Sequence, residues 1–294
     1  MTDISIYQIK IQIVNSFGSK LSFLLRSLIP PIFFIVSRKL SPTKSKSGIF
    51  WRGNYNSWSD ALQDTVGYDD EKILDSCSKA LSKVKNGEAA FERDGFLFED
   101  IVYSWPLLAI LQKAAIENSG KLVVLDFGGS LGSTYYQLKG FFSKELMIEW
   151  CVVEQKSFVE CGLENFENTN LHFFHTVEDC LKKYKPNLLL LNSVLQYLDD
   201  PYTWIGKFMG FDFPYVVLDR TGFVANGNDI LTIQNVKTEQ YATSYPAWFF
   251  GKDSLIKTFL KKYSVVSLLD DTIPPPSVIN GNRDVYWGGI IFKK

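Results

Sequence analysis

The sequence predicts an α/β protein with a doubly wound, mostly parallel sheet, an antiparallel last strand and a preceding helical N-terminal region. Short apolar runs that suit strands buried on both faces alternate with helical stretches from residue 121 onward. A glycine-rich turn follows the first run, and a long loop precedes the last. Alternating strands and helices joined by right-handed crossovers form such a sheet.

The segment K-L-V-V-L-D-F-G-G-S-L-G-S at residues 121–133 contains the first strand and its turn. Its apolar run ends at Asp126, and three glycines follow: Gly128, Gly129 and Gly132. Glycines let the backbone turn sharply and approach a ligand where a Cβ would clash. The helix predicted over 133–142 offers free N–H groups to a polar or anionic ligand. This pattern is typical of a nucleotide-type cofactor loop.

The spacing of this loop distinguishes between cofactors. A dinucleotide loop reads G-x-G-x-x-G, whereas this chain has D-x-G-x-x-x-G. An acid before the turn would repel a pyrophosphate and suit an ammonium group. The residues resemble motif I of class I S-adenosylmethionine-dependent methyltransferases, and this cofactor carries both an adenosine and an ammonium. The alternative is an ordinary strand–turn–helix.

The next predicted strand, residues 146–154, ends in Glu154. A carboxylate there can accept hydrogen bonds from two ribose hydroxyls; the alternative is a solvated strand-end glutamate. A third strand is expected over 170–175. The resemblance places Thr176 and Val177 against the adenine.

Residues 186–192 predict a fourth strand ending at Asn192, followed by S-V-L-Q-Y-L-D-D-P. This resembles the family's fourth motif, which faces the transferred methyl group and would place Asn192 at the cofactor. A fifth strand is expected over 215–220. A helix over 253–263 and strands over 265–269 and 286–292 complete the domain, and the last strand matches the antiparallel C-terminal strand of methyltransferases.

We divide the chain into a basic apolar arm (1–47), a helical cap region (48–118) and a methyltransferase domain (119–294). In the cap, helices are expected over 57–65, 69–86 (stopped by Gly87) and 99–117. F-E-R-D-G at 91–95 predicts a solvated turn, or a place where Arg93 holds a carboxylate or phosphate.

Residues 1–46 contain seven basic residues and one acidic residue, whereas the rest of the chain has 24 basic and 31 acidic residues. The apolar run at 21–37 is interrupted by Arg26 and two prolines, so it predicts no transmembrane segment. We expect peripheral membrane contact through residues 1–46, or a helix docked on the protein's own surface. The acidic body argues against nucleic acid, and the scattered Cys and His residues predict no metal site and reduced thiols in a cytoplasmic protein.

Six motifs together resemble one family: W-R-G-N-Y-N-S-W, G-Y-D, F-E-R-D, L-D-F-G-G-S-L-G-S, L-N-S-V-L-Q-Y-L-D-D-P and S-Y-P-A-W, which lie between residues 51 and 248. The members of this family are methyltransferases encoded among bacterial surface-polysaccharide and lipopolysaccharide biosynthesis genes. The resemblance runs from about Gly48 to the C-terminus. It implies a Rossmann-like fold, S-adenosylmethionine binding and a small-molecule or glycolipid saccharide acceptor, with the protein at the inner face of the membrane if the arm binds there.

A hydroxyl acceptor usually needs a base within hydrogen-bond reach. Asp219 is our first candidate, followed by His175 and by Tyr241 or Tyr245 on the loop expected after the fifth strand. Arg220 is a candidate to grip an anionic acceptor. Alternatively, Asp219 pairs with Arg220 or caps its strand, and the aromatic loop packs on the body.

Three interpretations remain open. The first is a methyltransferase, with an oxygen acceptor favoured because Asn192 does not continue as N-P-P-Y. The second is a dinucleotide enzyme, which would require G-x-G-x-x-G and Tyr-x-x-x-Lys. The third is a noncatalytic module that keeps the cofactor fold as a scaffold in a membrane-associated glycan biosynthesis assembly.

Overall fold

The computed structural model describes residues 48–65, 70–224, 227–237, 242–270 and 285–294. Residues 47–294 form one compact unit, and the arm 1–46 is divided from it. The predictions made for the arm, and for Tyr241, lie outside the described residues.

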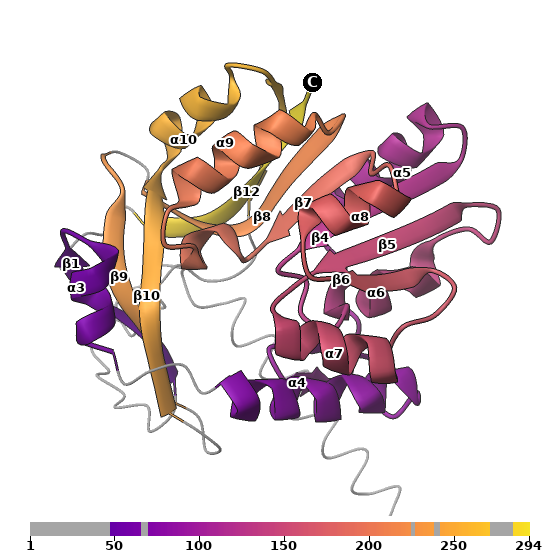
Figure 1. The fold of residues 1–294 in the computed structure, drawn as a ribbon, viewed down its shortest axis with the longest axis horizontal. Helices are drawn as coiled ribbons and strands as arrows, with labels where there is room; N and C mark the ends of the chain where they lie inside the picture. Colours follow the sequence, from indigo (N-terminus) through magenta and orange to yellow (C-terminus); the bar gives the residue numbers. More distant parts are fainter. Residues whose placement is uncertain (1–47, 66–69, 225–226, 238–241, 271–284) are drawn as a thin grey trace, which may run out of the picture. The chain divides into compact units, whose positions relative to one another are not determined.

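Seven strands form the predicted sheet (Figure 1). They are β4 (Lys121–Phe127), β5 (Met147–Val153), β6 (Leu171–Phe174), β7 (Leu188–Asn192), β8 (Tyr215–Val224), β11 (Ser264–Asp270) and β12 (Val285–Lys293). Their order in the sheet is β6-β5-β4-β7-β8-β12-β11. Neighbouring strands in the part β6-β5-β4-β7-β8 run parallel to one another. β12 runs antiparallel to both β8 and β11. The predicted fold class, a doubly wound, mostly parallel sheet with an antiparallel last strand, is confirmed.

Helices cover both faces because successive side chains of each strand point to opposite sides. Val124 of β4 belongs to the apolar core shared with α5 (Trp105–Glu117), α6 (Ser133–Leu138) and α7 (Lys156–Asn165). The next residue, Leu125, belongs to the core shared with α8 (Val177–Lys183), α9 (Pro201–Phe211) and α10 (Lys252–Phe259). The apolar runs of the central strands therefore reflect burial on two faces.

Three further strands extend the sheet beyond the carboxyl half of β8. β1 (Gly48–Tyr55) pairs antiparallel with β9 (Ile230–Lys237), which pairs antiparallel with β10 (Ala242–Gly251). β10 joins β8 in parallel where Phe250 pairs with Phe223. The segment after the fifth strand is therefore a hairpin, not the expected loop. The first residues of the cap form a strand, because their backbone groups pair with β9.

The rest of the cap begins with α3 (Trp58–Gln63), which starts as predicted because the Ser57 side chain accepts a hydrogen bond from Asp60 N. α4 (Asp70–Lys85) follows, and then β2 (Phe91–Arg93) and β3 (Phe96–Phe98) form a hairpin. Asp94 and Gly95 turn this hairpin with φ of 52° and 80°, as a two-residue type I′ turn requires.

α5 begins at Trp105 and not at Glu99, because Pro106 lacks a backbone N–H and is tolerated only in the first helical turn. Short 3₁₀ turns at Lys139–Phe141 and Leu195–Tyr197 (η1 and η2) follow α6 and β7. No helix of the described part of the chain is long and apolar enough to cross a membrane.

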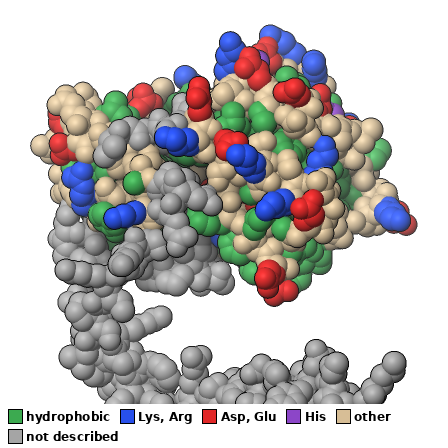
Figure 2. All heavy atoms as spheres, turned by 90° about the horizontal axis from the view of Figure 1, so that it is seen from below, with side chains coloured by type: hydrophobic (Ala, Val, Ile, Leu, Met, Phe, Trp, Pro, Cys, Tyr) green, Lys and Arg blue, Asp and Glu red, His purple; other side chains and the backbone are tan. Residues whose placement is uncertain are grey.

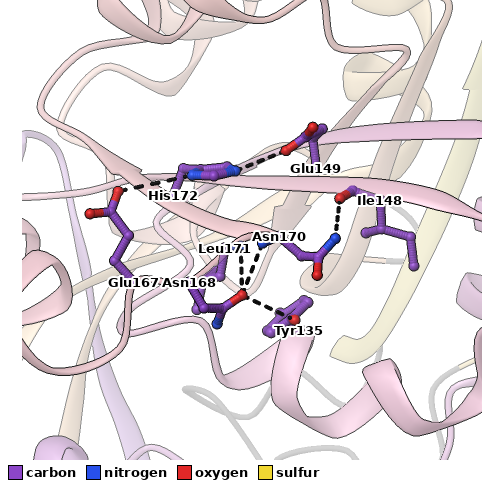
Figure 3. A network of polar contacts seen from close by, with 8 residues as sticks. All are labelled: Tyr135, Ile148, Glu149, Glu167, Asn168, Asn170, Leu171 and His172. Carbon is purple, nitrogen blue, oxygen red and sulfur yellow. Dashed lines mark hydrogen bonds and ion pairs between the residues drawn. The ribbon is translucent and has the colours of Figure 1, made fainter.

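A polar network joins β5, β6 and α6 near the start of β6 (Figure 3). Asn168 Oδ1 accepts hydrogen bonds from Tyr135 Oη (3.5 Å), Asn170 N (2.9 Å) and Leu171 N (3.2 Å). His172 Nε2 lies 2.8 Å from Glu149 Oε2, with its other ring nitrogen toward Glu167. This network lies at the opposite end of β6 from the edge where ligands bind in such sheets.

Candidate cofactor site and active site

Most of the predicted site residues lie where the parallel strands β4, β5 and β7 end and along β8. We call this region the strand-end site. It comprises the loop Asp126–Gly132, Glu154, Asn192 and the pair Asp219–Arg220. Register brings the last two strands together, because Asn192 pairs with Asp219. The site therefore results from parallel pairing of segments far apart in sequence.

The glycine loop is held to its neighbouring strands on both sides. Gly128 has a φ of +71° and donates its N–H to Val153 O at 2.9 Å. A Cβ on Gly128 would lie 2.3 Å from Val194 Cγ2, and Gly132 adopts a φ of +90° at the start of α6. At these positions glycine is required by conformation, and at Gly128 also by contact with the segment after β7.

Asp126 lies beneath the loop, fully buried. Trp150 Nε1 donates to its Oδ2 at 2.9 Å, while Oδ1 has no hydrogen-bond partner among the described residues. A Cβ on Gly129 would lie 2.6 Å from the Asp126 Cγ, so the carboxyl group packs directly against the loop. Burial raises the pKa of Asp126 to about 7, and Glu154 acts in the same direction.

Glu154 follows the last residue of β5 and is partly exposed. Its backbone N donates to Phe174 O at 3.2 Å, and its Oε2 accepts from Gln155 N at 2.6 Å. Thr176 instead caps α8, because its Oγ1 accepts from Asp179 N at 3.0 Å. Val177 is buried in the second core. Thr176 is exposed while its hydroxyl caps α8, and the Val177 side chain packs in the core. The contact of these two residues with an adenine stays a prediction.

Asn192 joins α6 to β8. Its Nδ2 donates to Thr134 Oγ1 at 3.2 Å, and its Oδ1 accepts from Arg220 Nε at 2.8 Å. Arg220 has a φ of +47°, which is uncommon for a residue with a side chain. The backbone turn and this hydrogen bond fix the direction of the Arg220 guanidinium within the site.

Asp219 is almost fully buried and lies within β8, because that strand continues to Val224 and not only to the expected residue 220. Its Oδ1 accepts from Arg220 N at 3.0 Å. Gln196, also buried, donates to Arg220 O at 3.2 Å and to Ser193 Oγ at 3.1 Å. The Asp219–Arg220 turn is therefore held by β8 itself and by the segment after β7.

The hairpin β2–β3 supplies a carboxylate that the sequence analysis missed. Glu92 is 3% exposed; Ser133 Oγ donates to its Oε1, and Gly95 N donates to its Oε2 at 3.1 Å. Burial raises the pKa of Glu92, and Arg220 opposes this. The available signal was the Asp94-Gly95 dipeptide between two segments that contain phenylalanine, F-E-R and F-L-F, which predicts a hairpin and not a solvated turn.

Tyr245 lies on β10, not on a loop. Its ring packs edge-on against Tyr197, with centroids 5.4 Å apart. Tyr197 Oη donates to Gln234 Oε1 at 2.9 Å, and burial raises the pKa of Tyr197 to about 12. Phe249 and Phe250 are core residues, as the packing alternative expected. His175 is exposed at the end of β6.

Within the described ranges, no group of three or more His, Cys, Asp or Glu side chains is arranged to hold a metal ion. All four cysteines are free thiols. On the face drawn in Figure 2, basic and acidic side chains are interspersed with hydrophobic ones.

No protein-family model matches the chain, and no curated protein matches it. Solved structures similar to it include the 1,6-didemethyltoxoflavin-N1-methyltransferase of Burkholderia thailandensis, crystallised with 1,6-didemethyltoxoflavin and S-adenosylhomocysteine. That match has 14% identity, covers 78% of this chain and 91% of the other, and has a TM-score of 0.39.

Two others are an S-adenosylmethionine-dependent methyltransferase of Clostridium acetobutylicum (10% identity, 65% and 92% covered, TM-score 0.41) and the amino pentose methyltransferase CalS10 of Micromonospora echinaspora (10% identity, 65% and 92% covered, TM-score 0.40). The fold assignment rests on strand order and direction.

Proposed function

We propose that this protein is an S-adenosylmethionine-dependent methyltransferase. One observation carries the proposal: a glycine loop after β4 lies beside a partly exposed carboxylate, Glu154, after the adjacent parallel strand β5. Ligands of doubly wound sheets bind at this edge. The loop allows close backbone approach, and the carboxylate can accept two hydrogen bonds from vicinal hydroxyls.

The charges around the loop suit this cofactor better than a dinucleotide. Asp126, Glu154 and the buried Glu92 are carboxyl groups near one loop, and Asp126 Oδ1 has no hydrogen-bond partner in the described part of the chain. With Glu154 and Glu92 ionised, such a site would repel a pyrophosphate and attract an ammonium or sulfonium group. When bound, S-adenosylmethionine supplies an electrophilic methyl group on its sulfonium. Glu154 would hold the ribose, and the loop and Asn192 would border the rest of the cofactor.

The protein's own contribution to methyl transfer is to align the acceptor and exclude water. We propose Asp219 as the base for a hydroxyl acceptor and Arg220 as the group that binds an acidic acceptor. Tyr245, held edge-on against Tyr197, offers an aromatic surface to a sugar ring.

We further propose a saccharide or glycolipid acceptor in surface-polysaccharide biosynthesis. The support is the combination of motifs in the sequence between residues 51 and 248.

The basic arm, residues 1–46, would bring the protein to anionic lipid at the inner membrane face. Co-sedimentation with anionic and neutral vesicles tests this: the full chain should bind anionic vesicles, and a fragment 47–294 should not. Equal binding by both proteins would contradict the role of the arm.

A noncatalytic scaffold is the second candidate. The observation that favours it is the near-complete burial of Asp219, whose Oδ1 accepts a hydrogen bond from its own neighbour's backbone, Arg220 N. A scaffold would bind the cofactor without turnover, whereas an enzyme would transfer its methyl group.

Calorimetric titration with S-adenosylmethionine, S-adenosylhomocysteine and NAD(P)H tests the proposal. We expect micromolar affinity for the first two and none for NAD(P)H. Glu154→Gln should lower these affinities about tenfold or more, since it weakens an acceptor for two hydroxyls. Glu160→Gln, which alters an exposed glutamate on α7, is the matched control. Transfer of a labelled methyl group from S-adenosylmethionine to saccharide acceptors then distinguishes an enzyme from a scaffold. A folded protein that binds neither adenosyl ligand would contradict both the methyltransferase and the scaffold proposal.

A further inference from the structure

Glu92 brings a buried carboxylate to the strand-end site from the cap, 41 residues before Ser133 in the chain. Each of its oxygens accepts a hydrogen bond, Oε1 from Ser133 Oγ and Oε2 from Gly95 N. Because Ser133 directly follows Gly132, the carboxylate lies where the glycine loop enters α6. The hairpin β2–β3 thus contacts the element that the proposed cofactor would touch.

This carboxylate is buried without an ion pair to any residue that the structure describes. Among the described residues its polar partners are a hydroxyl and a backbone N–H, and the arginine that influences it, Arg220, acts by longer-range attraction. Burying a carboxylate without a cation is unfavourable. The neighbouring Asp94 adds repulsion from the same hairpin.

A second buried carboxyl group, Asp126, packs against the same loop, and its Oδ1 has no hydrogen-bond partner in the described ranges. Glu154 repels it from the end of β5, and Arg220 attracts it from β8. Cys77 of α4, a neutral thiol here, is near Glu92, Asp94 and Glu154. The surroundings of the loop therefore contain more acidic than basic groups and favour a cationic ligand.

We propose that Glu92 binds the protonated α-amino group of the cofactor, so that the β2–β3 hairpin forms part of the cofactor site. This inference rests on the proposed function. An ammonium has three N–H donors, and each oxygen of Glu92 retains a lone pair beyond the hydrogen bond it already accepts. A sulfonium has no N–H, and adenosine has no cation, so the amino group is the part of the cofactor that matches a hydrogen-bonding carboxylate.

Ligands with and without the amino-acid portion test this in the full chain. S-adenosylhomocysteine carries the amino group, and 5′-methylthioadenosine lacks the whole amino-acid portion. By calorimetry, Glu92→Gln should weaken S-adenosylhomocysteine about tenfold or more, as expected for loss of a charged hydrogen bond, and change 5′-methylthioadenosine less than twofold. Glu99→Gln, which alters an exposed carboxylate outside the β2–β3 hairpin, should change neither affinity.

The desamino analogue of S-adenosylhomocysteine completes a thermodynamic cycle in which one change is made in the protein and one in the ligand. The wild type should bind this analogue as weakly as Glu92→Gln binds S-adenosylhomocysteine. The affinity of Glu92→Gln for the analogue should be no lower than that. If Glu92→Gln does not fold by circular dichroism, Glu92→Asp withdraws the carboxylate by one methylene, and the same selective loss is expected.

Equal weakening of both ligands would show that Glu92 only supports the fold, and unchanged affinity for S-adenosylhomocysteine would also overturn the inference while leaving the proposed function intact. Failure of the folded wild type to bind any adenosyl ligand would overturn both.

Discussion

Asp126 couples the pH to the stability of the strand-end site. Burial raises its folded-state pKa to about 7, whereas in an unfolded chain an aspartate titrates near ~3.9. Between these values the folded protein holds a proton that the unfolded chain has released. Stability contributed by the protonated group is therefore lost as the pH rises from about 4 to about 7.

We predict that Asp126→Asn removes this dependence and makes the ligand-free protein more stable than wild type at pH 8, by roughly 2–4 kcal/mol. Urea unfolding at pH 5, 6.5 and 8 measures the difference. Glu92, whose pKa burial also raises, remains in the variant and leaves a smaller slope of the same sign. Parallel pH profiles for both proteins would show that Asp126 stays ionised throughout.

A substitution at Gly128 tests whether the glycine loop tolerates a Cβ atom. Alanine there must adopt a φ of +71° and place its Cβ 2.3 Å from Val194 Cγ2. The conformation alone costs about 1–2 kcal/mol, so Gly128→Ala should lower the melting temperature and the affinity for S-adenosylhomocysteine. Gly140→Ala, whose Cβ would meet nothing within 4 Å, should change neither. The double variant with Val194→Ala should recover only part of the loss, and full recovery would show that the clash alone mattered.

At the level of elements, Asn168 connects α6 to the start of β6 through the three hydrogen bonds accepted by its Oδ1 (Figure 3). Asn168→Ala leaves two backbone N–H groups without this acceptor. Because Asn168 is exposed and water can take its place, we expect a loss of about 0.5–1.5 kcal/mol in the free energy of unfolding. The affinity for S-adenosylhomocysteine should be retained, because the network lies away from the strand ends. Asn165→Ala, on the exposed end of α7, is the control, and equal effects of the two substitutions would contradict this role.

At the level of the whole molecule, strand β1 joins the start of the cap to the C-terminal half of the chain. Residues 47–294 form one compact unit, and β1 pairs with β9 from the C-terminal half. We expect a fragment 47–294 to keep the melting temperature and ligand affinity of the full chain. A fragment 57–294 removes β1, leaves the edge of β9 unpaired and should be destabilised or aggregate. Equal melting temperatures of the two fragments would show that β1 is dispensable.

The secondary structure could be predicted where it depends on residues close together in the sequence, and not where it depends on pairing between distant segments. Strands β4, β5 and β7 consist mainly of apolar residues, so their positions were predicted within one or two residues. β1, β9 and β10 were missed because they carry mixed polar and aromatic residues, and their identity depends on pairing between residues 48–55 and 230–251. The start of α5 was missed because Pro106 outweighs the polar residues before it.

The same contrast holds for the site. The sequence by itself determined the chain order of the parallel strands β4 to β8, the glycine loop and the acids at the strand ends, because burial and backbone conformation act locally. Only the tertiary structure decided that Asp126 is buried against Trp150, that Asn192 joins Thr134 to Arg220, and that Glu92 of the cap meets Ser133. These contacts join residues 24 to 58 positions apart, and side chains at such distances meet only when the sheet and its covering elements have packed.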